Sequence, residues 1–124
     1  MKIKKLLDSI GRDVDTVSPD ETVYDALALM AKKEIGALVV LEEGKMVGIL
    51  SERDYARKVI LKGKSSKETA VREIMTSEII HISPDAKVEK GLSLMTKHHF
   101  RHLPVLEEDR LVGVLSIEDV RSVT

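Results

Sequence analysis

The chain has 124 residues, which suit one ordinary domain or two very small ones. Hydrophobic residues make up 43% of it, enough for a packed core, so the composition excludes an intrinsically disordered chain. The net charge of -1 argues against general electrostatic attraction to nucleic acids. The absence of cysteine excludes disulfide scaffolds and thiolate chemistry.

The first twelve residues predict a short amphipathic helix rather than a signal peptide. Asp8 interrupts the apolar stretch, no small-residue cleavage site follows, and Gly11 is expected to end the helix. The longest apolar run, Ala37–Leu41, is far too short to span a membrane, so we expect a soluble, cytoplasmic protein. The apolar residues at helical spacing are Ile3, Leu6, Leu7 and Ile10.

The clearest feature of the sequence is a tandem repeat. Val17-Ser18-Pro19-Asp20 recurs as Ile82-Ser83-Pro84-Asp85, an offset of 65 residues, and the register holds without a gap as far as Asp54 and Asp119. Chance does not keep register over half a chain, so the protein is a tandem duplication. Residues that are identical at this offset include Leu27, Leu29, Met30, Leu38, Val40, Leu41, Val47, Gly48, Leu50 and Ser51.

Each copy predicts the same order of elements, β-α-β-β-α, and hence an α/β (α+β) fold. We expect the two copies to pack sheet to sheet about a pseudo-twofold axis, with clefts where they meet, because so short a repeat hardly closes its own core. The first copy predicts a strand at 15–17, a helix from 23, strands at 37–41 and 46–50 and a helix from 51; the second predicts 79–82, a helix from 88, 102–106, 111–115 and a helix from 116. The predicted boundaries are 1–12 for the N-terminal helix, 13–62 and 76–124 for the two copies, and 63–75 for a linker with a turn of helix at 71–75.

One segment of each copy carries candidate chemistry. Residues 48–54, Gly-Ile-Leu-Ser-Glu-Arg-Asp, recur at 113–119 as Gly-Val-Leu-Ser-Ile-Glu-Asp, so that a strand runs into a helix through Ser-x-x-Asp. The serine and aspartate could simply cap the helix. Alternatively, the serine hydroxyl and helix N-terminus hold a phosphate while the aspartate accepts hydrogen bonds from a sugar diol. Both interpretations can hold at once, and the sequence leaves them open.

The doubled Ser-x-x-Asp segment, the Ser-Pro-Asp openings, the β-α-β-β-α order and the strand Leu103-Pro104-Val105 together resemble the cystathionine-β-synthase (CBS) domain pair. The resemblance implies a regulatory module, not an enzyme, that binds adenosine-containing ligands in clefts between the two copies. AMP, ADP and ATP are the expected ligands, with NAD or S-adenosylmethionine as further options, and no catalytic cofactor is implied. It also implies a homodimer that signals to a separate, unidentified protein.

The resemblance also implies the residues of the nucleotide site. The aspartates that bind ribose in the family correspond to Asp54 and Asp119. The hydroxyls that contact phosphate or ribose correspond to Ser51 and Ser116. The other expected contacts are Thr16 and His81 at the opening of each copy, the strand edges Ile35-Gly36-Ala37 and Phe100-Arg101-His102, and the aliphatic Val17 and Ile82, which with Ile35 would flank the adenine.

The two copies differ in charge at these positions. In the family a site usually joins the strand edge of one copy to the Ser-x-x-Asp of the other. Because phosphate prefers guanidinium and is repelled by carboxylate, we predict that the Asp54 site binds the more phosphorylated ligand. Asp54→Ala should then remove more affinity than Asp119→Ala. One site would combine Phe100, Arg101 and His102 with Ser51, Arg53 and Asp54, and the other Ile35, Gly36 and Ala37 with Ser116, Glu118 and Asp119.

Other functions find less support in the residues. No Walker-type loop, acidic metal cluster or paired nucleophile and base is present, which argues against an enzyme. Aromatic residues make up 2%, which leaves little to stack on nucleic-acid bases. The remaining alternative is a dimerisation scaffold that works without a nucleotide. No metal site is expected, because a helical i, i+4 pair is missing among the four histidines His81, His98, His99 and His102.

Overall fold

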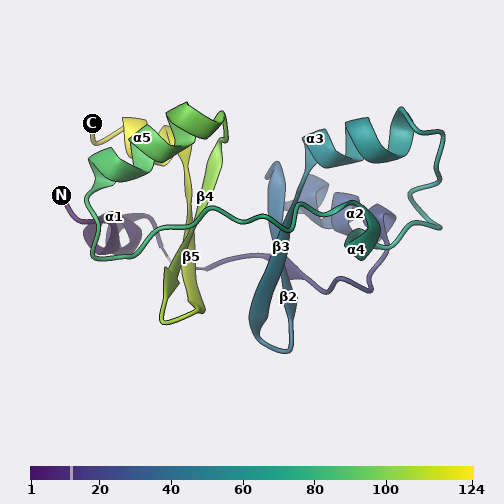
Figure 1. Cartoon of the computed structure of the whole chain (residues 1–124), viewed down its shortest axis with the longest axis horizontal. Helices are drawn as coiled ribbons and strands as arrows, with labels where there is room; N and C mark the ends of the chain where they lie inside the picture. The colour runs from purple at the N-terminus through teal and green to yellow at the C-terminus, as the bar shows by residue number, and fades with distance from the viewer. Residues whose placement is uncertain (12) are drawn as a thin grey trace. The chain divides into compact units, whose positions relative to one another are not determined.

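The computed structural model describes residues 1–11 and 13–124 and divides into two compact units (Figure 1). One unit is Asp15–Ile79, and the other joins Met1–Val14 to Ile80–Thr124. Each unit carries one small sheet with helices, which confirms the predicted mixture of α and β. The predicted boundary between the N-terminal helix and the first copy falls at residue 12, outside the described residues. Within the part of the chain described, no helix is both long and apolar enough to cross a membrane.

The unit Asp15–Ile79 contains a three-stranded sheet in the order β1-β2-β3. The first pair of strands is parallel and the second is an antiparallel hairpin. The predicted elements are therefore confirmed, apart from shifts of a residue or two at their ends. The elements are β1 (Thr16–Val17), α2 (Val23–Lys33), β2 (Ala37–Glu42), β3 (Lys45–Ser51), α3 (Glu52–Tyr55), a π-helix η1 (Ala56–Ile60) and α4 (Val71–Ile74).

The other unit repeats the hairpin but not the third strand. The strand predicted at 79–82 is wrong in extent, because the structure has a single parallel bridge between Ile82 and Val105 there. Two backbone hydrogen bonds hold this bridge: Ile82 N donates to Pro104 O (3.1 Å), and Leu106 N donates to Ile82 O (3.0 Å). The elements are α1 (Ile3–Ile10), α5 (Val88–His98), β4 (His102–Glu107), β5 (Arg110–Ser116) and α6 (Ile117–Arg121).

Both hairpins close with the same two-residue turn. Glu43 and Gly44 have φ of 52° and 79°, and Glu108 and Asp109 have φ of 51° and 66°. Two successive residues with positive φ form the turn whose twist matches that of the flanking strands, and Gly and Asp adopt this conformation readily. Each hairpin therefore turns in the gap between two predicted strands, and the strand that follows leads to Ser-x-x-Asp.

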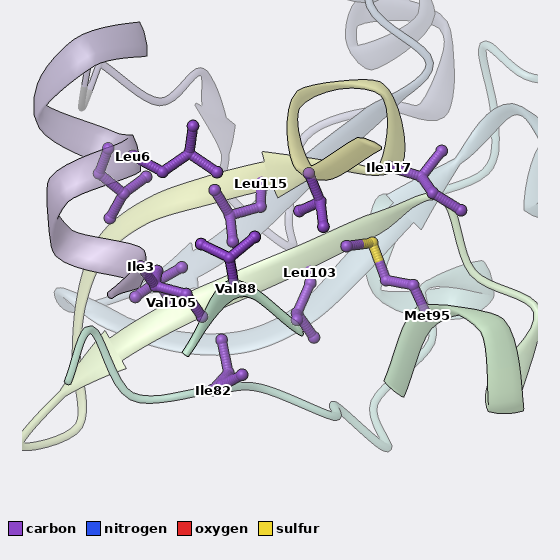
Figure 2. Close-up of a cluster of buried hydrophobic side chains, with 11 residues drawn as sticks. Ile3, Leu6, Ile82, Val88, Met95, Leu103, Val105, Leu115 and Ile117 are labelled. Atoms are coloured by element: carbon purple, nitrogen blue, oxygen red, sulfur yellow. The ribbon is translucent and has the colours of Figure 1, made fainter. Parts of the chain in front are cut away.

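Helix α1 belongs to the core of the second copy (Figure 2). Ile3 and Leu7 are fully buried, and Ile3 N donates to Ala86 O at 2.9 Å. Gly113 leaves room for this helix, since a Cβ there would lie 2.8 Å from Leu7 Cδ2. Gly11 ends the helix with φ of 99°, as predicted. The buried residues packed with α1 are Ile82, Val88, Met95, Leu103, Val105, Leu115, Ile117 and Val120.

Helix α4, from the segment between the copies, plays the same part in the first copy. Val71 N donates to Glu21 O (2.8 Å), as Ile3 N does to Ala86 O in the other unit. Val71 and Ile74 are buried in the core of that copy. Each copy is therefore completed by the segment that precedes the other copy in the sequence. A chain cut between the first copy and α4 would leave both cores open.

Candidate functional site

The first Ser-x-x-Asp segment caps α3. Ser51 Oγ accepts a hydrogen bond from Asp54 N (3.2 Å), and Asp54 Oδ2 accepts one from Ser51 N (2.9 Å). These reciprocal bonds satisfy two backbone donors that the start of a helix otherwise leaves unpaired. The capping interpretation of the sequence is confirmed for this copy.

The Asp54 carboxylate is also contacted by three side chains of its own unit. Its Oδ2 accepts from Ser51 Oγ (3.0 Å), and its Oδ1 accepts from Thr76 Oγ1 (3.1 Å) and lies 3.2 Å from Lys58 Nζ. Lys58 Nζ donates in addition to Ile74 O at 2.9 Å. An ionised carboxylate has about four acceptor positions, and the protein fills all of them here. Asp54 is only 8% exposed.

Lys58 reaches Asp54 from the π-helix η1. The residue lies four positions after Asp54, and the chain turns more widely here, with Leu61 N donating to Ala56 O (3.1 Å). Single π-helical turns are uncommon and frequently occur at functional sites. Sequence reasoning missed both Lys58 and Thr76. The i, i+4 spacing of Asp54 and Lys58 was the signal for one of them, whereas nothing in the sequence linked Thr76 to Asp54.

The second Ser-x-x-Asp segment caps α6 in the same way but leaves its carboxylate open. Ser116 Oγ accepts from Asp119 N (3.0 Å), and Asp119 Oδ2 accepts from Ser116 N (3.2 Å). Across residues 1–11 and 13–124, that backbone bond is the one hydrogen bond to the Asp119 carboxylate. Asp119 is half-buried.

The difference between the two aspartates follows from their neighbours. At the repeat offset, Lys58 corresponds to Val123, which has no side-chain donor. In the first copy helix α4 ends at Ile74 and Thr76 forms a bridge to Ile49, whereas α1 continues as a helix to Ile10. Among residues 1–11 and 80–124, no side chain donates to Asp119 as Lys58 and Thr76 do to Asp54 Oδ1.

Each strand edge lies beside the Ser-x-x-Asp of its own copy. Ala37 pairs with Ser51, and Glu52 N donates to Gly36 O (3.0 Å). Likewise, Ile117 N donates to Arg101 O (2.8 Å). The expected combination of one copy's strand edge with the other copy's Ser-x-x-Asp involves both units and stays a prediction.

Arg101 forms an ion pair with Glu118. Both side chains are exposed, so this pair adds little to stability. The pKa of Glu118 is lowered chiefly by a hydrogen bond from its own backbone N–H and, to a smaller extent, by the Arg101 guanidinium. The sequence prediction assigned Arg101 and Glu118 to different sites, whereas the structure shows them in contact in the same unit as Asp119.

The other predicted contacts lie in varied surroundings. Val17 and Ile82 are buried in the two apolar cores, and Thr16 on β1 is half-buried. Phe100 stacks on His98 with ring centroids 5.4 Å apart. Among the described residues, no three His, Cys, Asp or Glu side chains form a group that could hold a metal ion. The exposed residues are Arg53, His81 and Arg101, and the half-buried ones are Ile35, Gly36, Ala37, Phe100 and His102.

His102 gives this region a dependence on pH. Burial at the start of β4 is the main cause that lowers the pKa of His102 below its ordinary value near 6.5. The charge of Arg101 lowers this pKa further, whereas the charges of Glu118 and Asp119 raise it. Below about pH 6.5 the unfolded chain therefore binds more protons than the folded chain, and stability falls as the pH falls. We expect the wild type to lose more unfolding free energy between about pH 7 and pH 5 than His102→Gln. Urea unfolding across this range checks it; equal losses would contradict it.

Comparison with known proteins gives the family. The CBS domain model matches residues 7–61 and 71–123. The mitochondrial CBS domain-containing protein CBSX3 of Arabidopsis thaliana is 41% identical over 95% of this chain, and the chain spans 62% of that protein. A structure of a CBS-domain protein from Burkholderia ambifaria MC40-6 is 43% identical with a TM-score of 0.94, over 99% of this chain and 93% of the other.

A further solved structure carries ligands. The CBS domain pair of protein MJ0100, in complex with 5′-methylthioadenosine and S-adenosyl-L-methionine, is 26% identical to this chain with a TM-score of 0.87, over 99% of this chain and 94% of the other. The two family matches together cover most of the sequence and coincide with the two repeats. The chain belongs to the CBS domain family and carries two CBS domains in tandem.

Proposed function

We propose that the chain is a regulatory module without catalytic activity that binds an adenosine-containing ligand at Ser-x-x-Asp. The observation that carries the proposal is the half-buried Asp119 carboxylate, to which the described residues give one hydrogen bond and leave its other acceptor positions unused. A ribose diol offers two adjacent hydroxyl donors, which suit an ionised carboxylate. Ser116 next to it adds a hydroxyl whose oxygen already accepts from Asp119 N and whose proton remains to be donated.

AMP, ADP or ATP is the proposed ligand, with S-adenosylmethionine or NAD as further members of the class. The complex of the MJ0100 CBS pair supports an adenosine moiety as the common part. Arg101 and His102 at the start of β4 are the proposed phosphate contacts, because a guanidinium binds phosphate oxygens well. Contact of the ligand with the other copy stays a prediction, as does flanking of the adenine by Val17, Ile82 and Ile35.

Ligand binding would act by population shift. A nucleotide stabilises whichever conformation binds it more tightly, so it changes what a partner protein meets. In this proposal the chain works as a homodimer in the cytoplasm and passes the signal to a separate protein. The alternative, a dimerisation scaffold that needs no nucleotide, gains some support from Asp54, whose carboxylate is filled by its own unit.

Isothermal titration of nucleotide-free protein with AMP, ADP, ATP, NAD and S-adenosylmethionine tests the proposal. We expect saturable binding of at least one of them, and its loss in the Asp54→Ala/Asp119→Ala double variant. Circular dichroism of the same samples checks that the variant is folded. Absence of binding to any of these ligands by folded wild-type protein would contradict the proposal and favour the scaffold.

A further inference from the structure

We propose that Lys58 and Thr76 keep the first Ser-x-x-Asp closed to ligands, so that the wild-type chain binds one adenosine-type ligand, with Asp119 as the acceptor of its hydroxyl groups. This inference rests on the proposed function and assigns it to one of the two repeats. It also reverses the order that the charges in the sequence predicted, in which the Asp54 site ranked first.

The closure of the first site lies in the hydrogen bonds of Asp54. Thr76 Oγ1 donates to Asp54 Oδ1 at 3.1 Å, and Lys58 Nζ lies 3.2 Å from the same oxygen. The other oxygen accepts from the backbone and hydroxyl of Ser51. A sugar diol needs both acceptor positions of one oxygen, or one on each, and the protein already occupies them.

Opening this site would break more than one interaction. Lys58 Nζ also donates to Ile74 O (2.9 Å), so its displacement leaves both the carboxylate and that carbonyl without their donor. Hydrogen bonds to a charged group are about twice as strong as neutral ones. A ribose diol that displaced the protein donors of Asp54 would form hydrogen bonds to the same carboxylate, and so only replace the ones that it broke. The ligand therefore gains little net free energy at Asp54, while at Asp119 each new hydrogen bond is an addition.

The second copy differs at both blocking positions. At the repeat offset Val123 corresponds to Lys58, α1 is still helical where the first copy has left α4 for Thr76, and no described side chain donates to the Asp119 carboxylate. Arg101 lies in the same unit, and its backbone oxygen accepts from Ile117 N next to Ser116. The acceptor and a cationic side chain thus belong to the same repeat, which is the combination that a phosphorylated nucleoside requires.

The test is the stoichiometry of adenosine binding by full-length protein, measured by calorimetry. Wild-type protein should bind one adenosine per chain, and the Lys58→Met/Thr76→Val variant should bind two. Valine keeps the branched shape of Thr76, and methionine keeps most of the unbranched length of Lys58, so the substitutions remove the two donors and the charge of Lys58 with little change in packing. Lys62→Met, an exposed lysine on the same segment, is the matched control and should leave the stoichiometry at one. Thermal melts followed by circular dichroism confirm that each variant is folded.

Asp119→Asn in the wild-type background should weaken the single site at least about tenfold, because a hydrogen bond to a charged group is lost. Two sites in the wild type, or loss of its single site in Asp54→Asn with retention in Asp119→Asn, would overturn the inference and leave the proposed function standing. If the wild type binds no adenosine, one site gained by Lys58→Met/Thr76→Val still supports closure by these residues. Absence of binding in both proteins would overturn the inference and the proposed function together.

Discussion

Leu7→Ala is expected to lower the free energy of unfolding by about 2–5 kcal/mol, the range for large-to-small substitutions in a packed core. Leu7 is fully buried, and its side chain packs against Gly113 in the second CBS domain. Removing its branched side chain leaves a cavity between α1 and β5 that a rigid helix and strand cannot fill by relaxation. The effect should therefore fall on the second domain, although Leu7 lies at the N-terminal end of the first family match.

Ile10→Ala is the matched control for this prediction. Ile10 lies on the same helix but is 42% exposed, so its loss should change stability by less than about 0.5 kcal/mol. Urea unfolding of both variants measures the difference, and hydrogen exchange of β5 amides shows which domain is affected. Equal effects of the two substitutions, or exchange that increases only in residues 15–79, would contradict the assignment of α1 to the second domain.

Asp54→Ala is expected to lower the free energy of unfolding by about 2–3 kcal/mol, from loss of the helix cap and of buried hydrogen bonds to a charged acceptor. The substitution leaves Ser51, Thr76 and Lys58 without their shared acceptor. The Lys58 ion pair adds little to this figure, because 43% of the lysine side chain is exposed. The loss thus reflects the hydrogen bonds that join α3 to the end of α4.

Asp119→Ala provides the comparison within the same chain. Its carboxylate accepts one hydrogen bond, from Ser116 N, so the substitution should cost about 1 kcal/mol, as for an ordinary helix cap. Thermal and urea unfolding of the two variants gives the difference directly. A larger loss in Asp119→Ala than in Asp54→Ala would show that the two carboxylates do not differ in the way the hydrogen bonds indicate.

Most of the repeated fold could be predicted from the sequence, because its determinants are local. Short apolar runs predicted the strands of both hairpins, and the turns lie in the gaps between those strands, at Glu43-Gly44 and Glu108-Asp109. The Ser-x-x-Asp segments predicted helix starts, and the structure has a capping box at both. Where the prediction was too long, at 79–82, a single bridge at Ile82 replaces the strand.

The core into which α1 packs could not be predicted from its amphipathic pattern alone. Such a pattern shows that a helix has an apolar face, but not which core that face joins. Aligning Ile3 and Leu6 with Val71 and Ile74 would have required an offset three residues longer than that of the repeat. The backbone bonds to Ala86 and Glu21 show this equivalence, which a gap-free comparison misses.

The sequence also did not predict that Asp54 and Asp119 have different hydrogen-bond partners. Both occur in the same Ser-x-x-Asp pattern, and the residues that contact Asp54 Oδ1 come from outside the pattern. Lys58 reaches it from the π-helix and Thr76 from the end of the linker. Sequence reasoning ranks sites by the charges within the motif, whereas hydrogen bonds from distant residues decide whether an acceptor is open.

The central claim is that a carboxylate of Ser-x-x-Asp accepts hydrogen bonds from the ribose of an adenosine ligand. Parallel titration of the protein with adenosine and with 2′,3′-dideoxyadenosine tests it most directly, since the two ligands differ only in the hydroxyl groups in question. The dideoxy compound should bind at least about tenfold more weakly than adenosine, and Asp119→Asn should abolish this preference. Equal affinities for the two ligands in the wild type would contradict it.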